Sequence, residues 1–532
     1  MRMRRWRYGI GIALLGMTVF SFGGCGGKTE QQNAADESEN RKEQQSTLRI
    51  FDKNAKVDFD DEIAKAIMEK TGLNIEVIDA TDNPGEKVDM MLAYRDYPDM
   101  ILIDLEDIGR YRESGCLVDI SSYVDREGSN VKAMYGDTLN RLKEPDGSLY
   151  YLSNWYGEDR NAVSAFQIRY DYLVSLVGKE RADSDEPFTQ EEFLELLRLF
   201  RERYPQIDGQ DSIAFTLNLK FEYDNCFRGM YGMKLYYEDD DRLYHLVRHP
   251  RYLDMMNFLN CMYREGLLDK SWVVSNEQLF ADNVKSGKVF ATVCAYWDLA
   301  ELNRYLQSTY GEDAVMLGYK VLGEGIDERE TTYGGRNTIG WDAIAVTDHC
   351  ENVQDAIRLM EFLSSEEGQY LMLWGIEGKD WTLQNGVHQP SQEILDMLQE
   401  ESVTEKTPIR RWTWFVKNGY GSDGTPYYLT EYYLPGRIAQ VSNRNMKYDY
   451  WDMAPYSNLE PERGSREALK WKNIEDILYR AYPKMVNAAT HEEMEQIYEN
   501  MIESMEMEGL SEVEAVITEK YQNRLRQWGE ER

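Results

Sequence analysis

Between residues 47 and 104 the chain alternates strand-like and helix-like segments, a pattern that few folds accommodate. Apolar runs typical of buried strands occupy residues 48–51, 74–78 and 100–103. Apolar side chains recur at helical spacing at Phe59, Ile63, Ala66 and Ile67, and a more polar helical stretch covers residues 85–94. Strands that alternate with helices in this way predict a parallel, doubly wound α/β sheet with right-handed crossovers.

The carboxyl ends of these strands are the expected ligand-binding edge, because open parallel sheets bind ligands there. Asp52 and Asp104 each follow a predicted strand. We therefore expect both carboxylates to contact a ligand. The alternative is that each caps the N-terminus of the following helix.

The length of 532 residues exceeds what one hydrophobic core usually serves, which favours two domains. Further buried strands are predicted at 289–296 and 343–346, and the tail from about residue 470 has a helical pattern. We expect a first α/β lobe formed by residues 47–156 and 338–400. The second lobe is expected to comprise residues 157–337 and 401–532, with a helical C-terminus.

The N-terminal 24 residues have the layout of a secretory signal peptide. Four arginines and no acidic residue precede a short apolar run from Ile10 to Phe22, and small residues then lead to Cys25. This arrangement resembles a bacterial lipobox, so we expect cleavage before Cys25, lipidation of its thiol and a disordered polar tether over residues 26–46. The alternative is an uncleaved anchor helix. Both interpretations place the body outside the cytoplasm, on the membrane.

The charge of the chain excludes several classes of partner. Its formal net charge is −35, so nucleic acid and anionic lipid surfaces are poor partners. The cysteines beyond Cys25 are odd in number, widely spaced and without a CxxC pair, and we expect them to be small buried side chains rather than a disulfide framework. They are Cys116, Cys226, Cys261, Cys294 and Cys350.

Several segments in a fixed order resemble the family 1 extracellular solute-binding proteins. They are YRDYPDMILID (94–104), GCLVDISSYVD (115–125), the PDGSLYYLSNW hairpin (145–155), IRYDYL (168–173), PFTQEEFLELLRLF (187–200), MYREGLLDKSW (262–272), VKSGKVFATVCAYW (284–297) and WGIEGKDWT (374–382). The resemblance implies a two-lobed, periplasmic-binding-protein-like (type II) fold with a hinge between the lobes. It also implies a monomeric lipoprotein that captures a carbohydrate, expected to be an oligosaccharide, for the permease of an ABC importer, with no cofactor.

A sugar site needs directional hydrogen-bonding groups beside aromatic rings, and the sequence offers clusters with that chemistry. We expect ligand contacts from Asn154, Trp155, Tyr156, Tyr296, Trp297, Asp298, Arg336, Trp341, Trp374, Glu377 and Trp381. The alternative for each tryptophan is packing in a core or between lobes, the usual role of large aromatic side chains.

Residues 410–456 are rich in aromatic side chains within a loop-like setting of Gly, Asn and Pro. This segment is either a lid or added wall of the binding cleft, or a packed surface subdomain.

Two further functions stay open at this point: binding of a peptide or other polar solute, and hydrolysis of glycosides. The many carboxylates could supply the acid and base of a glycosidase, but no pair can be chosen from the sequence. The histidines show no metal-ligand spacing, and GxSxG and phosphate-binding loops are missing from the sequence. We therefore expect no enzyme activity and no metal site. The acidic stretch 238–242 is expected to tip a solvated hairpin.

Overall fold

The computed structural model describes residues 47–80, 83–160, 164–218, 223–399, 402–429, 437–462 and 464–530. The expected signal peptide, the lipidation site Cys25 and the tether lie outside the described residues. In the described part the chain forms two large hydrophobic cores, each built on its own sheet, and a smaller third cluster around Phe280, Leu299 and Leu306.

The first lobe contains a five-stranded sheet in the order β2-β1-β3-β16-β4. Strands β1, β2 and β3 are parallel, as the sequence pattern predicts, whereas β16 is antiparallel to both of its neighbours, β3 and β4. Because β4 pairs with β16, residues 145–155 do not form a hairpin of their own. Its elements are β1 (Thr47–Asp52), α1 (Glu62–Thr71), β2 (Asn74–Ile78), α2 (Pro84–Tyr94), β3 (Met100–Asp104), α3 (Ile108–Glu113), α4 (Ser121–Glu127), α5 (Ser129–Tyr135), α6 (Asp137–Leu142), β4 (Tyr151–Asn154), β16 (Asp342–Val346), α14 (Val353–Leu363), α15 (Glu366–Trp374), β17 (Trp381–Gln384), β18 (Val387–Pro390), α16 (Gln392–Gln399) and α17 (Val403–Lys406).

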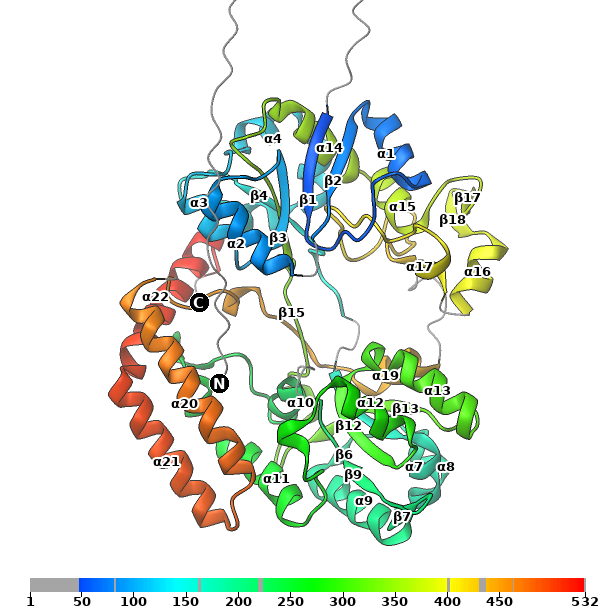
Figure 1. Ribbon diagram of the computed structural model, residues 1–532, viewed down its shortest axis with the longest axis vertical. Coiled ribbons are helices and arrows are strands. Elements are labelled where there is room, and N and C mark those ends of the chain that lie inside the picture. The colour runs from blue at the N-terminus through cyan, green and yellow to red at the C-terminus, as the bar shows by residue number, and fades with distance from the viewer. Residues whose placement is uncertain are drawn as a thin grey trace, which may run out of the picture. The chain divides into compact units, whose positions relative to one another are not determined.

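The second lobe contains a four-stranded sheet in the order β13-β5-β12-β9, and three long C-terminal helices that pack on one another (Figure 1). Its elements are β5 (Ser164–Arg169), α7 (Tyr170–Val177), α8 (Lys179–Ala182), β6 (Phe188–Thr189), α9 (Gln190–Arg203), β7 (Gln206–Ile207), β8 (Gln210–Asp211), β9 (Ile213–Phe215), α10 (Tyr223–Met230), β10 (Tyr237–Asp239), β11 (Arg242–Tyr244), α11 (Tyr252–Arg264), α12 (Glu277–Lys285), β12 (Val289–Ala295), α13 (Ala300–Tyr310), β13 (Met316–Tyr319), β14 (Val321–Leu322), β15 (Gly334–Arg336), α19 (Arg437–Asn445), β19 (Tyr450–Asp452), α20 (Arg466–Val486), α21 (His491–Glu508) and α22 (Leu510–Trp528).

The segment 402–429 differs from the expected lobe assignment, because it packs in the first core and not in the second. Trp412 and Trp414 lie against Phe59, with ring centroids 4.7 and 5.2 Å from it. The indole N–H of Trp414 donates to Asp52 Oδ2 over 2.8 Å, and that of Trp412 donates to Asp61 Oδ2 over 2.8 Å. These aromatic side chains therefore complete the core beside α1, which the chain before residue 400 leaves open.

Two structures connect the lobes in addition to the chain crossings. Strands β15 and β19 form a parallel pair, in which Arg336 is opposite Asp452. At the C-terminus, Trp528 packs against the first core, and its indole N–H donates to the carbonyl oxygen of Arg141 over 3.2 Å. The last helix thus begins in the second lobe and ends on the first.

Two expectations from the sequence concern the acidic stretch 238–242 and the cysteines. The acidic stretch forms the β10–β11 hairpin, whose turn residues Asp240 and Asp241 are exposed and have positive φ, so the solvated hairpin is confirmed. The side chains of Cys116, Cys226 and Cys294 are buried, and those of Cys261 and Cys350 are partly buried. Within the described residues, no helix has the length and apolar character to cross a membrane.

Candidate functional site

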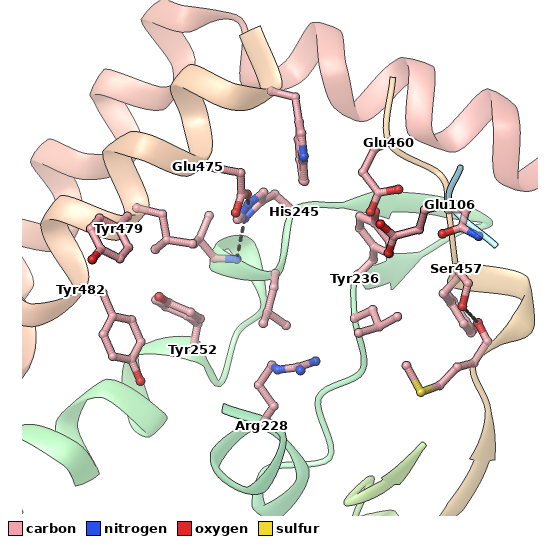
Figure 2. A pocket seen from close by; sticks show the side chains of 18 of the residues that line it. Glu106, Arg228, Tyr236, His245, Tyr252, Ser457, Glu460, Glu475, Tyr479 and Tyr482 are labelled. Atoms are coloured by element: carbon pink, nitrogen blue, oxygen red, sulfur yellow. Dashed lines mark hydrogen bonds and ion pairs between the residues drawn. The ribbon is translucent and has the colours of Figure 1, made fainter. Parts of the chain in front are cut away.

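A cavity of about 860 Å³ has the mixture of aromatic and polar groups that a small polar ligand requires (Figure 2). Aromatic side chains form much of its wall. They are Tyr236, Tyr252, Trp272, Trp341, Tyr456, Trp471, Tyr479 and Tyr482. Charged and amide side chains are interspersed among them, namely Glu106, Arg228, His245, Asn337, Asn458, Glu460, Glu475, Arg480 and Lys484.

One wall comes from the segment between the β10–β11 hairpin and α11. His245 directly follows β11 and is buried, and its Nδ1 accepts a hydrogen bond from the Val247 N–H over 3.2 Å. The other ring nitrogen, Nε2, therefore carries the hydrogen and donates to Glu475 Oε1 at 3.1 Å. This bond holds the Glu475 carboxylate at the cavity wall, where its second oxygen can accept from a ligand hydroxyl (Figure 2).

The adjoining wall is one side of α20. Trp471, Glu475, Tyr479 and Tyr482 line the cavity, and their spacing of three to four residues places them on one helix face. The N-terminus of this helix is fixed by Ser465, whose side chain accepts from the Ala468 N–H. Exposure varies along the face: Trp471 and Tyr482 are partly buried, whereas Tyr479 is 82% exposed. The cavity therefore opens to solvent near Tyr479.

The first lobe contributes Leu105, Glu106 and Trp341. Leu105 donates its N–H to the Trp341 carbonyl over 3.2 Å, which holds the two chain segments together beyond the ends of β3 and β16. Burial raises the pKa of Glu106, and the nearby negative charges of Glu460 and Asp104 raise it further. Trp341 is 50% exposed, so its ring is free to meet a ligand.

The strand ends of the first sheet, where Asp52 and Asp104 were expected to bind ligand, are partly neutralised by the protein itself. Asp52 is only 3% exposed and accepts from Trp414 and from the Asn54 N–H, so its contacts are internal. Burial raises the pKa of Asp52. Lys53 forms ion pairs with Asp104 and, at 2.6 Å, with Asp342. Asp104 is still well exposed, next to Leu105 of the cavity. Neither aspartate caps α1, which Asp61 does.

Most of the other expected contact residues in the first lobe lie in its core. Asn154 is buried and its amide bonds to Thr413 O and Val416 N, at 2.5 and 2.8 Å. Tyr156 is buried and stacks on Tyr135 at 3.8 Å.

The WGIEG turn is structured in a similar way. Trp374 donates to the Pro426 and Tyr427 carbonyls, Trp381 donates to the Gly375 carbonyl, and both rings are buried, whereas Glu377 is exposed. These buried side chains have the packing role that was the alternative, and a ligand contact for them stays a prediction.

The remaining expected residues lie nearer the surface. Trp155 is partly buried with a positive φ of 59°, and Trp297 is 47% exposed in the short 3-10 helix Tyr296–Leu299. The Asp298 carboxylate caps that helix by accepting from the Ala295 N–H over 3.2 Å. Tyr296 meets the Trp297 ring edge to face, at 4.9 Å. Arg336 donates to Asp159 Oδ2 at 3.0 Å. Of all the expected contacts, only Trp341 lines the cavity.

Sequence reasoning missed most of the cavity, and only part of it carried a signal. The repeat of aromatic and acidic side chains along one face of α20 is visible in the sequence, as is the aromatic segment 410–456. Different parts of that segment lie in different places: Trp412 and Trp414 pack in the first core, whereas Met453 and Tyr456 line the cavity. Tyr236 and Tyr252 have no local sequence signal that separates them from other buried tyrosines.

The arrangement suits reversible binding of a polar ligand that has apolar faces. Rings can stack on such faces, and carboxylates, amides and guanidinium groups can bind hydroxyls. Among the described residues, no cluster of three or more His, Cys, Asp or Glu side chains is arranged to hold a metal ion.

Comparison with known proteins agrees with this interpretation. The profile of the bacterial extracellular solute-binding proteins matches residues 62–376. Lipoprotein LipO of Bacillus subtilis (strain 168) is 21% identical over 338 residues, which are 61% of this chain and 64% of that relative. The match thus spans less than two thirds of the relative's length.

Two solved structures have the same fold. The alginate-binding protein AlgQ2 has a TM-score of 0.63 at 18% identity, over 89% of this chain and 97% of that one. An HMO-binding, ABC-transporter-associated solute-binding protein from Bifidobacterium longum infantis has a TM-score of 0.64 at 14% identity, over 90% and 99% of the two chains. The expected two-lobed α/β fold is confirmed. The chain belongs to the bacterial extracellular solute-binding protein family.

Proposed function

We propose that the protein captures a carbohydrate in the cavity of Figure 2 and delivers it to the permease of an ABC importer. The observation that carries this proposal is the composition of the cavity wall: rings from both lobes surround a space of about 860 Å³, with acidic and amide groups between them. Ligand that contacts Trp341 of the first lobe and Tyr252 or Tyr479 of the second would favour the closed arrangement of the lobes.

The anchoring and the partners form part of the same proposal. The protein is held on the outer face of the cell membrane by a lipid on Cys25, with residues 26–46 as a tether, and works there as a monomer. The family match, the lipoprotein relative, and the alginate- and HMO-binding structures support an extracytoplasmic carbohydrate receptor.

The first experiment screens the purified protein against mono- and oligosaccharides and against peptides by thermal shift. A ligand at 100 times its Kd adds about 2.7 kcal/mol of stability, which a melting curve detects easily. We expect oligosaccharides to be the strongest hits. If only peptides stabilise the protein, its ligand is a peptide and not a carbohydrate.

The second experiment tests the cavity itself. Trp341→Ala should weaken the best sugar hit by about 5- to 150-fold, since a ring that stacks on a ligand contributes about 1 to 3 kcal/mol. Apo stability should change little, because half of the Trp341 surface is already exposed. Tyr94→Ala is the matched control: Tyr94 is 76% exposed on α2 and lies outside the cavity, so its variant should bind normally. If the two variants bind the sugar with equal affinity, the binding site lies outside this cavity.

Incubation of the protein with the best sugar hit separates binding from catalysis. Glu106 and Glu460 place two carboxylates in the cavity, and burial raises the pKa of Glu106, which is the arrangement that a glycosidase acid requires. A binding protein returns its sugar intact after prolonged incubation. Cleavage that is lost in Glu106→Gln would instead identify a surface glycoside hydrolase.

A further inference from the structure

We propose that Trp155, Arg410 and Tyr428 form a second ligand subsite on the first lobe, which takes a carboxylate-bearing sugar unit of the bound carbohydrate. This inference rests on the proposed function and deepens it. It assigns an acidic unit to Arg410 and neutral units to the cavity.

The three side chains form a stack around one guanidinium group. The guanidinium carbon of Arg410 lies 4.2 Å from the ring centroid of Tyr428 and 5.5 Å from that of Trp155. The two rings are inclined at 74°, with their centroids 6.3 Å apart. Nη1 of Arg410 donates to the Tyr428 hydroxyl. The aromatic side chains therefore fix the plane and the direction of the positive charge.

Arg410 still has hydrogen-bonding capacity that the protein does not use. Its Nε–H is buried and has no acceptor, and no carboxylate of the described residues forms an ion pair with this guanidinium. The neighbouring Arg411 is different, because its Nη1 pairs with Asp61 Oδ2 at 3.1 Å. In a chain of net charge −35, an arginine left without a carboxylate at a partly exposed position is a good receptor for an anion.

The backbone presents these side chains at some conformational cost. Trp155 and Arg410 both have a positive φ, of 59° and 65°, in a backbone region that residues other than glycine seldom adopt. Both residues are tied down by neighbours: the Trp155 carbonyl accepts from Asn418 Nδ2 over 3.1 Å, and the Arg410 N–H donates to the Met372 carbonyl over 2.9 Å. The surrounding structure therefore holds two unfavourable conformations side by side, as is common where a ligand is gripped.

None of the three side chains lines the cavity, but the backbone brings Trp155 close to Trp341, which does. Strands β4 and β16 are antiparallel with Asn154 opposite Asp342, and the Trp341 N–H donates to the Asn154 carbonyl over 3.1 Å. Trp155 follows Asn154 and Trp341 precedes Asp342, so both tryptophans lie at the same end of these two strands. Because Trp341 lines the cavity, a ligand of several units can extend from the cavity past Trp341 to Trp155 and Arg410.

The charges of the two places differ. The cavity wall carries three acidic side chains, Glu106, Glu460 and Glu475, and three basic ones, Arg228, Arg480 and Lys484, so it has no net charge to attract a carboxylate. Arg410 offers a planar donor set that matches a carboxylate, beside an indole face that suits a pyranose ring. We therefore expect an oligosaccharide that combines neutral units with an acidic one.

The test uses pairs of sugars that differ only at one carboxyl group. The probes are uronate-containing oligosaccharides derived from xylan, such as aldotriouronic acid, together with their carboxyl-reduced counterparts, measured by titration calorimetry. Wild-type protein should bind the acidic form at least tenfold more tightly than the reduced form, and added salt should narrow this preference. R410Q should remove the preference by weakening binding of the acidic form much more than binding of the reduced form, and R410K should restore part of the preference.

R411Q is the matched control, because it makes the same change at the next residue without touching the stack. It should keep the preference for the acid. If wild-type protein binds the reduced form as tightly as the acid, or if R410Q keeps the preference, the second subsite is refuted while the sugar-binding function stands. If neither member of any pair binds and the wider sugar screen is also negative, the proposed function fails, and the subsite with it. Melting curves of all variants show whether a loss of binding reflects unfolding.

Discussion

Replacing Trp414 with phenylalanine should destabilise the protein by about 2.5 to 4 kcal/mol at neutral pH. The variant loses the indole N–H that donates to the buried Asp52 carboxylate, a bond worth about 1.5 to 3 kcal/mol when the acceptor is charged. The ring also shrinks by about 40 Å³, which at about 24 cal/mol per Å³ adds about 1 kcal/mol. In an Asp52→Ala background, which has no acceptor, only the volume cost should remain, so a double-mutant cycle isolates the bond.

The pH dependence has a definite sign. Trp414 binds the charged form of Asp52, so its loss raises the carboxyl pKa, which burial already raises. The cost of Trp414→Phe should therefore be full when Asp52 is ionised and should decline as the pH falls through its pKa, where both proteins carry a neutral acid. Urea unfolding at several pH values measures this. If Trp414→Phe costs as much in the Asp52→Ala background as in the wild-type protein, the coupling energy is near zero, and the hydrogen bond is refuted as a source of stability.

Three further predictions concern separate parts of the chain. Trp297→Ala should change apo stability by less than about 1 kcal/mol, because the ring is 47% exposed; since Trp297 does not line the cavity, sugar affinity should fall about 5- to 150-fold in calorimetry only if the ligand extends to this ring, and strong destabilisation with normal binding would make it a packing residue. Burial would raise the pKa of Asp423, but hydrogen bonds from Thr425 and His388 to its carboxylate outweigh burial and lower it. The stability that this carboxylate contributes should be lost as the pH falls below about 4. The free energy of unfolding of Asp423→Asn should therefore depend less steeply on pH in the acid range. Cys25→Ala should release the protein into the medium or leave an uncleaved precursor, and membrane fractionation that finds it processed and still bound would contradict the anchor.

Local patterns in the sequence predicted the elements of the fold well. The capping box of Thr189 and Glu192 is present at the start of α9. The same spacing at Ser511 and Glu514 is misleading, since α22 begins at Leu510 after Gly509, whose φ of 99° allows the sharp change of direction. Glu514 instead accepts from the His245 N–H, a tertiary contact that no local pattern encodes.

The site was harder to predict than the fold, because its parts are far apart in the chain. Trp341 was identified, since it directly precedes a predicted strand of the first lobe. His245 and Glu475 were not, because their significance depends on a hydrogen bond between residues 230 positions apart. Burial in the core and exposure in a cavity also favour the same residue types, so Trp374 and Trp341 look alike in the sequence although one is buried and the other is half exposed.

The position of β16 in the first sheet has a consequence for how the chain folds. This strand, Asp342–Val346, lies between β3 and β4, and the core around it is finished only by Trp412 and Trp414. As the chain emerges N-terminus first, the earliest residues must wait for more than half of the polypeptide before their lobe can close, whereas the sheet of the second lobe is complete by Tyr319. Such long-range pairing slows folding and leaves apolar strand edges open to chaperones and proteases during synthesis. The sheet of the second lobe is therefore expected to gain protection from hydrogen exchange before the sheet of the first, although it starts later in the sequence and its core is completed only by the C-terminal helices.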